Sequence, residues 1–242
     1  MKHLLFSDVH SNLEALEVLL AHISEEKPDK IFFLGDVVGY GANPSECLQT
    51  VADMSDLILA GNHDAAAAGI LSMTNFNPLA KEVIFWTQSQ LSPEEIVYLK
   101  NLPVILQFPE FCLVHSSPWR SEQWKYIITE KDAADNFPYF SSSLCFIGHS
   151  HRAEIFILDP SENCRISLNE AIEVKKNYRY IVNVGSVGQP RDNNPQAAYC
   201  LYDDQKKYIQ IHRFDYNIQK AQQKIIQANL PHFLAERLSF GI

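Results

Sequence analysis

Short apolar runs alternate with segments of helical spacing along the first sixty residues. Apolar runs of three or four residues, which are typical of buried strands, occur at residues 4–6, 31–34 and 57–60. Two segments with helical apolar spacing lie between them, one beginning at Leu13 and the other at Asn43-Pro44-Ser45, where proline suits a first helical turn. This strand–helix–strand–helix–strand order predicts parallel strands in one sheet.

The rest of the chain changes from helical to strand-rich patterning. Helices are predicted at residues 78–90, 93–101 and 130–136, and strands at residues 104–106, 111–114 and 144–147. Further strands are predicted at residues 155–158, 180–184, 197–202 and 208–211, with a hairpin turn at 203–206 and a terminal helix at 215–229. Because no repeat, low-complexity tract or linker interrupts the pattern, we expect a single domain over residues 1–242.

Polar residues that could carry chemistry follow the apolar runs. The segments after the first three predicted strands contain Asp8, His10, Asp36, Asn62, His63 and Asp64. The carboxyl ends of parallel strands share one edge of a sheet, so we expect these side chains to converge in space. Two later strands end in the same way, one in His115 and the other in Gly148-His149-Ser150-His151.

The composition excludes several classes of function. A net charge of −9 disfavours binding to a nucleic acid backbone, which needs clustered Lys and Arg. No apolar run approaches the roughly 18 residues of a membrane span, and the N-terminal run is too short for a signal peptide. Five scattered cysteines without a C-x-x-C pair indicate reduced thiols. We therefore expect a cytoplasmic protein that binds neither a membrane nor long nucleic acid.

The donors that follow the predicted strands are typical of a metal site. They are Asp8, His10, Asp36, Asn62, His115, His149 and His151. Oxygen and imidazole donors without a thiol suit Mn²⁺, Fe²⁺ or Zn²⁺. Seven donors are too many for one tetrahedral ion but natural for two ions that share a carboxylate. Two metals roughly 3.5–4 Å apart can hold a hydroxide and clamp a phosphate during in-line attack.

Five ordered blocks of the sequence resemble the signature of the calcineurin-like metallophosphoesterases. These blocks are Asp8-Val9-His10, Gly35-Asp36, Gly61-Asn62-His63-Asp64, Val114-His115 and Gly148-His149-Ser150-His151. The likeness extends to residues 11–16 and 183–192, and the chain is most similar to the small bacterial phosphoesterases or phosphodiesterases of one domain. One block departs mildly from the family pattern, which often has His-Gly where this chain has His115-Ser116.

This resemblance implies both a fold and a division of labour in the site. The fold would be α/β, a four-layer αββα sandwich of two mixed β-sheets flanked by helices. The cofactors would be two divalent ions, chosen among Mn²⁺, Fe²⁺, Ni²⁺ and Zn²⁺. One ion would take Asp8, His10, Asp36 and His151, and the other would take Asp36, Asn62, His115 and His149. His63 would stay off the metals and protonate the leaving oxygen, and Asp64 would orient it.

The implied activity is hydrolysis of phosphomonoesters or phosphodiesters, nucleotides included, by a metal-bridging hydroxide. A metal-dependent nuclease is the chemically close alternative, which the acidic charge disfavours for long chains. A non-catalytic scaffold is another alternative, but such a chain would be expected to lose ligands or the acid. The sequence does not choose the natural substrate, the physiological metal or the oligomeric state.

Several residues are candidates for contact with the substrate. Arg191 is predicted to bind phosphate, because a guanidinium matches a phosphate bidentately, although a solvent-facing or salt-bridged Arg191 is the alternative. Asn12 is predicted either to touch the substrate or to cap the first helix. Arg152, next to His151, is a weaker candidate of the same kind. Aromatic residues that could wall a base or aryl group, or cover a sheet edge instead, are Trp119, Trp124 and Tyr126.

Overall fold

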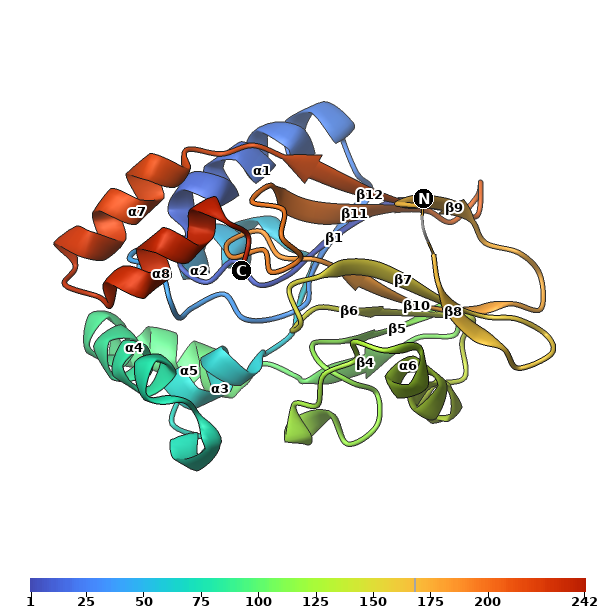
Figure 1. The fold of residues 1–242 in the computed structure, drawn as a ribbon, viewed down its shortest axis with the longest axis horizontal. Coiled ribbons are helices and arrows are strands. Elements are labelled where there is room, and N and C mark those ends of the chain that lie inside the picture. Colours follow the sequence, from blue (N-terminus) through green and yellow to red (C-terminus); the bar gives the residue numbers. More distant parts are fainter. Residues whose placement is uncertain (168) are drawn as a thin grey trace.

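The computed structural model describes residues 1–167 and 169–242 and contains two six-stranded β-sheets (Figure 1). The first sheet has the order β3 (Leu57–Ile58), β2 (Lys30–Phe33), β1 (Lys2–Phe6), β11 (Ala197–Asp203), β12 (Tyr208–Phe214) and β9 (Ala171–Glu173). The second has the order β4 (Ile105–Gln107), β5 (Phe111–Val114), β6 (Leu144–Ile147), β10 (Arg179–Val184), β7 (Ala153–Leu158) and β8 (Cys164–Ile166).

Each sheet contains three neighbouring parallel strands among antiparallel ones. In the first sheet these are β1, β2 and β3, and in the second they are β5, β6 and β10. The remaining pairings, such as β1 with β11 and β10 with β7, are antiparallel. Both sheets are therefore mixed, and in each the carboxyl ends of three parallel strands meet at one edge.

The two sheets face each other across a shared apolar core. Because side chains alternate along a strand, Leu5 of β1 packs between the sheets while Phe6 packs on the outer face. Val182 of β10 joins Leu5 in the core between the sheets. On the outer face of the second sheet, Ile147 packs with Ala133 of the helix that covers it. Both faces of both sheets are thus covered by apolar packing.

Helices form the outer layers of the molecule (Figure 1). Helices α1 (Leu13–Glu26) and α2 (Pro44–Met54) cover the first sheet, and α6 (Glu130–Asn136) covers the second. The other helices are α3 (Asn62–Ala67), α4 (Pro78–Gln90), α5 (Pro93–Lys100), α7 (Ile218–Gln227) and α8 (His232–Glu236). Short 3₁₀ turns are η1 (Met73–Asn75), η2 (Ser121–Gln123), η3 (Phe137–Tyr139) and η4 (Arg237–Ser239). The predicted four-layer αββα sandwich is confirmed.

The C-terminal helix α7 contacts α1, one of the helices that cover the first sheet. Buried Glu14 of α1 forms ion pairs with Lys224 (2.6 Å) and Lys220 (3.2 Å) of α7. This contact ties residues near the end of the chain to its beginning, and a single domain over residues 1–242 stays our prediction. None of the described helices is long and apolar enough to cross a membrane.

Several elements match their predicted bounds, and others need correction. The predictions at residues 78–90, 111–114, 130–136 and 144–147 are confirmed to the residue. The segment after the third strand, to which the apolar pattern assigns no helix, begins α3: Gly61 is its N-cap, and the next three residues are its first turn. The apolar pattern does not predict β8, β9 or α8, because elements of three to five residues carry too little periodicity.

Candidate metal centre

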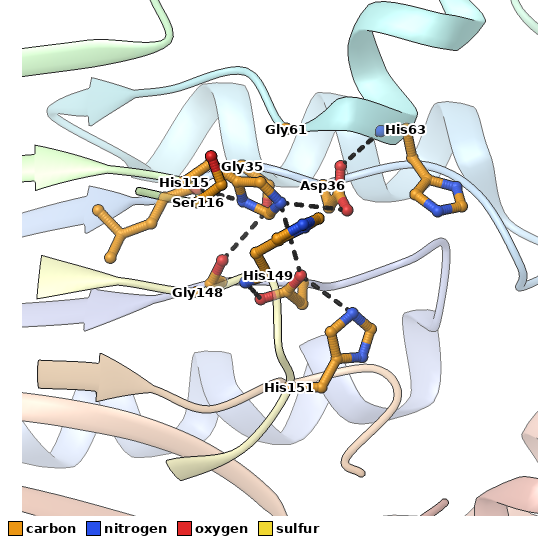
Figure 2. Close-up of polar contacts among 12 residues, drawn as sticks. Gly35, Asp36, Gly61, His63, His115, Ser116, Gly148, His149 and His151 are labelled. Atoms are coloured by element: carbon orange, nitrogen blue, oxygen red, sulfur yellow. Dashed lines mark hydrogen bonds and ion pairs between the residues drawn. The ribbon is translucent and has the colours of Figure 1, made fainter. Parts of the chain in front are cut away.

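Polar residues from both sheets meet at the edge where the parallel strands end (Figure 2). They are Asp8, His10 and Asp36 from the first sheet and His115, His149 and His151 from the second. All six side chains are buried. Their ligand atoms form two groups, and within each group all atoms lie within 4.8 Å of one another. The first group is Asp8, His10, Asp36 and His151, and the second is Asp36, His115 and His149. Asp36 belongs to both groups, as the resemblance implies.

Asn62, the seventh predicted ligand, opens α3 beside this cluster. Its Oδ1 atom is buried and makes no hydrogen bond to any residue that the structure describes. The next residue, His63, donates its main-chain N–H to Asp36 Oδ1 over 2.8 Å, which ties the first turn of α3 to the shared carboxylate. Asn62 therefore brings an amide oxygen without a protein partner to the same place.

Main-chain carbonyl groups fix the orientation of the four histidine rings. Three rings donate from Nδ1: His10 to Val38 (3.0 Å), His115 to Leu34 (2.8 Å) and His151 to Gln189 (2.6 Å). A carbonyl oxygen can only accept, so these Nδ1 atoms carry hydrogen and each Nε2 is left for the centre. His149 is reversed, since its Nε2 donates to Trp124 O over 2.9 Å and Nδ1 is left. Metal-binding histidines usually have such support.

The distances within the cluster fit bound cations. His10 Nε2 and His151 Nε2 lie 3.1 Å apart, although both present lone pairs when Nδ1 carries the hydrogen. His151 Nε2 also lies 3.2 Å from Asp8 Oδ1, and His115 Nε2 lies 3.3 Å from Asp36 Oδ2. Lone pairs this close repel each other unless a positive charge lies among them. The nitrogen and oxygen donor set suits divalent ions such as Mn²⁺, Fe²⁺, Ni²⁺ or Zn²⁺.

Burial and mutual charge set the pKa values in the centre. Burial lowers the pKa of His149 to about 3 and that of His10 well below its ordinary value, so both rings are neutral at neutral pH. Burial also opposes the charged form of His115, but the Asp36 carboxylate raises the pKa of His115 to about 9. Burial raises the pKa of Asp36, yet His115 and His63 outweigh it and hold this pKa well below its usual range. The shared carboxylate thus attracts positive charge.

Five of the predicted ligands have a left-handed main chain. Their φ angles are 55° for Asp8, 46° for His10, 60° for Asp36, 68° for His149 and 58° for His151. Residues other than glycine rarely adopt this conformation, because Cβ approaches the following carbonyl oxygen. In an extended strand, residues two apart would point to the same face of the sheet. Here the backbone is bent at the predicted ligands themselves. The Asp-x-His and His-x-His spacings therefore bring both side chains of each pair to one centre.

Two glycines allow the ligand segments to approach closely. A Cβ atom at Gly61 would lie 2.0 Å from Asp36 Oδ1, and one at Gly148 would lie 2.1 Å from Ser7 Oγ and 2.6 Å from Asp8 Oδ2. These distances are far below van der Waals contact, so a larger residue at either position would displace a ligand carboxylate. The close approach explains why glycine precedes both Asn62 and His149.

The carboxylate of Asp64 makes its hydrogen bonds to the main chain, and the role predicted for it beside His63 stays a prediction. The Asp64 carboxylate accepts four main-chain N–H groups, from Asp36 (2.7 Å), Val37 (3.0 Å), Val38 (3.1 Å) and Gly61 (3.0 Å). Burial and the nearby Asp36 raise the pKa of Asp64, and the amide donors oppose that rise. Asp64 therefore holds the loop after β2 and the start of α3 together. Both of its oxygens accept main-chain N–H groups, and the structure records no hydrogen bond between Asp64 and the imidazole of His63.

His63 lies beside the cluster without belonging to either group (Figure 2). Its ring packs against the rings of Tyr40 (4.4 Å between centroids), His10 (4.9 Å) and Phe76 (5.6 Å). Its Nδ1 atom makes no hydrogen bond within the described part of the chain. Burial lowers the pKa of His63 to about 4. Aromatic packing, rather than a carboxylate, positions this ring.

The predicted substrate contacts separate into two kinds. Asn12 caps α1, since its Oδ1 accepts from Ala15 N (3.2 Å) and its Nδ2 donates to Gly188 O (2.8 Å). Its side chain is thus engaged within the protein, and the capping alternative holds. Arg191 remains close to the centre: its main-chain N–H donates to His151 O (3.0 Å), and its guanidinium lies 5.4 Å from the centre of the Tyr40 ring.

Two of the remaining candidates, Arg152 and Trp119, make contacts elsewhere, and the other two line a cavity. Arg152 forms an ion pair with Glu154 over 2.8 Å, which accounts for its side chain. Trp119 stacks on Tyr139 with ring centroids 5.8 Å apart, so it does not wall the site. The other two predicted aromatic residues, Trp124 and Tyr126, do line a cavity next to the centre.

This cavity has a volume of about 450 Å³. Its walls include Asn62, His63 and His149, so it adjoins the metal centre directly. The rest of the lining comes from the residues on either side of η1, from α4 and from the segment around η2, namely Leu71, Ser72, Phe76, Asn77, Ala80, Glu122, Gln123, Trp124 and Tyr126, together with Tyr40. The sequence points to residues 75–78 and 119–139 only as loops that could set the substrate. It gives no individual role to Phe76, Asn77 or Gln123, because no motif marks them and only the fold brings them to one cavity.

A comparison with known protein families gives the decisive observation. The family model described as the calcineurin-like phosphoesterase superfamily domain matches residues 1–207. The chain belongs to the calcineurin-like phosphoesterase superfamily. It is therefore a phosphoester hydrolase of a metal-dependent family, and its buried Asp and His cluster is suited to bind metal ions.

Individual proteins also match over most of this chain. A metallophosphoesterase from Sphaerobacter thermophilus is 38% identical, with a TM-score of 0.88 over 100% of this chain and 99% of that one. The uncharacterized protein MJ0912 of Methanocaldococcus jannaschii is 39% identical over 97% of this chain and 96% of its own length. A symmetrical bis(5′-nucleosyl)-tetraphosphatase of Actinobacillus pleuropneumoniae is 25% identical over 73% of this chain and 64% of its own length.

Proposed function

We propose that this phosphoesterase holds two divalent metal ions and hydrolyses small phosphomonoesters or phosphodiesters, nucleotides included. One observation carries the proposal: two buried ligand groups share Asp36 directly beside a cavity of about 450 Å³. One ion is assigned to Asp8, His10, Asp36 and His151, and the other to Asp36, Asn62, His115 and His149. When bound, two such ions would lower the pKa of water and stabilise negative charge on a phosphate.

The protein's own contribution begins with fixed geometry. The carbonyl groups that accept from the histidine rings keep the ligating nitrogen of each ring turned inward. Asp64 holds the loop that carries Asp36 through three of its four amide contacts. Because these groups are already placed before substrate arrives, little reorganisation accompanies the reaction.

His63 is proposed as the general acid. Hydrolysis joins a water oxygen to phosphorus and breaks the ester P–O bond, and the departing oxygen then needs a proton. His63 lines the cavity, lies outside both ligand groups and has a ring nitrogen without a hydrogen bond among the described residues. Burial keeps the ring neutral in the absence of substrate, whereas the negative charge of a bound phosphate favours its protonated form.

Arg191 is proposed to contact the phosphate. Its Nε and Nη2 donate to Gln189 Oε1 (3.2 and 2.6 Å), which leaves Nη1 without a partner among the described residues. Gln189 in turn accepts from His151 through its main-chain oxygen. The guanidinium is thus anchored next to a proposed metal ligand while keeping a donor for an anionic oxygen.

The substrate is proposed to be small. The cavity falls in the size range of small-molecule sites, about 300–1,000 Å³. The relative named symmetrical bis(5′-nucleosyl)-tetraphosphatase acts on a nucleotide, which supports nucleotides as candidates for this chain. The net charge of −9 of this chain argues against binding of long nucleic acids.

The test is hydrolysis of p-nitrophenyl phosphate and bis(p-nitrophenyl) phosphate with Mn²⁺, Fe²⁺, Ni²⁺ and Zn²⁺ in turn. We expect activity with at least one ion, about two bound metals per chain, and loss of both in Asp36→Ala. Activity that survives Asp36→Ala would contradict the proposal. A purified protein without bound metal or activity would favour the scaffold alternative, and processive cleavage of single-stranded DNA would favour the nuclease.

A further inference from the structure

The cavity beside the metal centre has a chemical character that simple phosphate hydrolysis does not need. A phosphate alone requires the ligand groups and a cation such as Arg191. The cavity extends this site with walls from two segments that are distant in the sequence. One lies within residues 71–80, on either side of η1 and into α4, and the other within residues 122–126. The first segment contacts His63 and the second contacts His149, and both histidines line the cavity. A bound group that fills the cavity would therefore be attached to the reacting phosphate.

Aromatic rings line the cavity at both segments. The Tyr126 ring stacks on the ring of His149, with centroids 4.1 Å apart and an angle of 10° between planes. Phe76 packs edge-on against His63, with centroids 5.6 Å apart. Tyr126 is nevertheless 50% exposed, so one part of its ring remains open for contact. Flat aromatic surfaces of this kind stack on planar ligands such as nucleobases.

Polar groups with unused hydrogen-bonding capacity lie among these rings. The side chains of Glu122 and Gln123 form no hydrogen bond within the described residues, and both are exposed. Asn77 uses its Oδ1 to cap α4 by accepting from Ala80 N (2.9 Å), which leaves its amide nitrogen available. An aliphatic or phenyl group would leave these donors and acceptors unmatched. A nucleobase, which is planar and carries ring nitrogens and exocyclic groups, would satisfy both kinds of surface.

His63 gives the bound group a direction. Under the proposed function, the departing oxygen faces the general acid, and the nucleophile attacks from the opposite side. The cavity shares His63 as a wall, so the group inside it is the one that leaves. From the combination of aromatic rings, unpaired polar side chains and a shared general acid, we infer that the cavity binds the nucleobase of a nucleotide whose nucleoside is the leaving group. This inference rests on the proposed function and specifies its substrate.

The experiment compares two substrates with the same sugar phosphate ester. Adenosine 5′-monophosphate and ribose 5-phosphate differ in whether a base is attached, and both are tested as free phosphates and as methyl esters. We expect kcat/KM to be at least about 10-fold higher for the substrate with the base, the factor that about 1.4 kcal/mol of stacking supplies. Guanosine, cytidine and uridine 5′-monophosphates extend the comparison to other bases.

Variants locate the preference in the cavity. We expect Phe76→Ala and Tyr126→Ala to lower the ratio of the two kcat/KM values towards one, and Tyr126→Phe to retain it. The matched control is Phe85→Ala, because Phe85 lies on α4, is 60% exposed and does not line the cavity. The ratio should be unchanged in that variant.

The outcomes separate this inference from the proposed function. Equal kcat/KM values with and without a base would overturn the inference while leaving phosphoester hydrolysis intact. The inference would also be overturned if the protein hydrolysed p-nitrophenyl phosphate but cleaved neither adenosine 5′-monophosphate nor ribose 5-phosphate. A base preference that persists in both alanine variants would place base recognition outside the cavity and would also overturn it. Absence of hydrolysis of every phosphoester would instead remove the proposed function itself.

Discussion

The candidate metal centre and the cavity beside it are built in opposite ways, although the predicted ligands Asn62 and His149 also line the cavity. In the centre the predicted ligands are held by the backbone, and the histidine rings among them donate to main-chain carbonyls. In the cavity, exposed side chains such as Tyr126 and Gln123 lie on short or irregular segments. Under the proposed function, the fold would fix the reaction, while substrate choice would rest on side chains that can change without disturbing it.

The largest expected effect comes from the residue that both ligand groups share. Asp36→Asn keeps the shape of the side chain but removes the charge, so we expect kcat/KM to fall by about 10³-fold or more, because metal ions supply several kcal/mol of charge stabilisation. The loss should be equal for substrates with and without a base. Metal content and kinetics measured on the same preparation check this, and a selective loss for one substrate would break the proposed separation of centre and cavity.

His63 stands on the border between the two regions and should affect chemistry without affecting metal binding. In His63→Gln we expect the turnover of alkyl phosphates, whose leaving groups need a proton, to fall about 10²- to 10³-fold. p-Nitrophenyl phosphate, which has a good leaving group, should lose much less. Metal analysis should still find the wild-type content. Loss of metal in His63→Gln would mean that His63 is a metal ligand and belongs to the centre.

A variant of Asp64 tests how much the hydrogen bonds to the main chain contribute to stability and to metal affinity. Asp64→Asn replaces an acceptor of four N–H groups by an amide that carries its own donors. We expect the free energy of unfolding to fall by about 1.5–3 kcal/mol, the size of a hydrogen bond to a charged group. Metal affinity should fall about 10- to 100-fold, as for other residues that support ligands. A variant of normal stability and metal content but reduced kcat would support the predicted role of Asp64 towards His63.

The smallest effect is expected at Arg191, which borders the centre but is not among its ligands. Arg191→Ala should raise KM about 10-fold, because one hydrogen bond from a cation to phosphate is lost, and should change kcat little. Arg152→Ala is the matched control, since Arg152 is engaged by Glu154 and should leave both constants unchanged. An equal response of the two variants would mean a general effect of charge.

The sequence alone predicts the metal centre far better than the cavity. The predicted ligands sit in short motifs at the ends of strands, and the topology of parallel strands is sufficient to bring Asp8 and Asp36 together at one edge of a sheet. His115 follows a strand of the second sheet and reaches the same place because the two sheets face each other. Left-handed backbone at these positions then completes the convergence, which no apolar pattern reveals. Resemblance to the family supplied the division of the ligands between two ions.

Side-chain partners were harder to predict from the same motifs. Adjacent acid and imidazole residues suggest a hydrogen-bonded pair, but Asp64 lies in the first turn of α3, where its carboxylate meets the amides of the preceding loop instead. Asn12 is likewise engaged by helix capping. The cavity residues Phe76 and Gln123 are far apart in the sequence and follow no spacing rule, so only tertiary structure reveals their common role.

The left-handed backbone at five ligands also bears on how long the protein survives in a cell. Each such residue costs about 1–2 kcal/mol, a large share in total of the roughly 5–15 kcal/mol that stabilises a typical domain. Ions that bind only the folded state offset this cost by mass action. A chain synthesised when divalent metals are scarce would unfold more often and meet proteases sooner. Metal supply would then regulate the abundance of the enzyme as well as its activity.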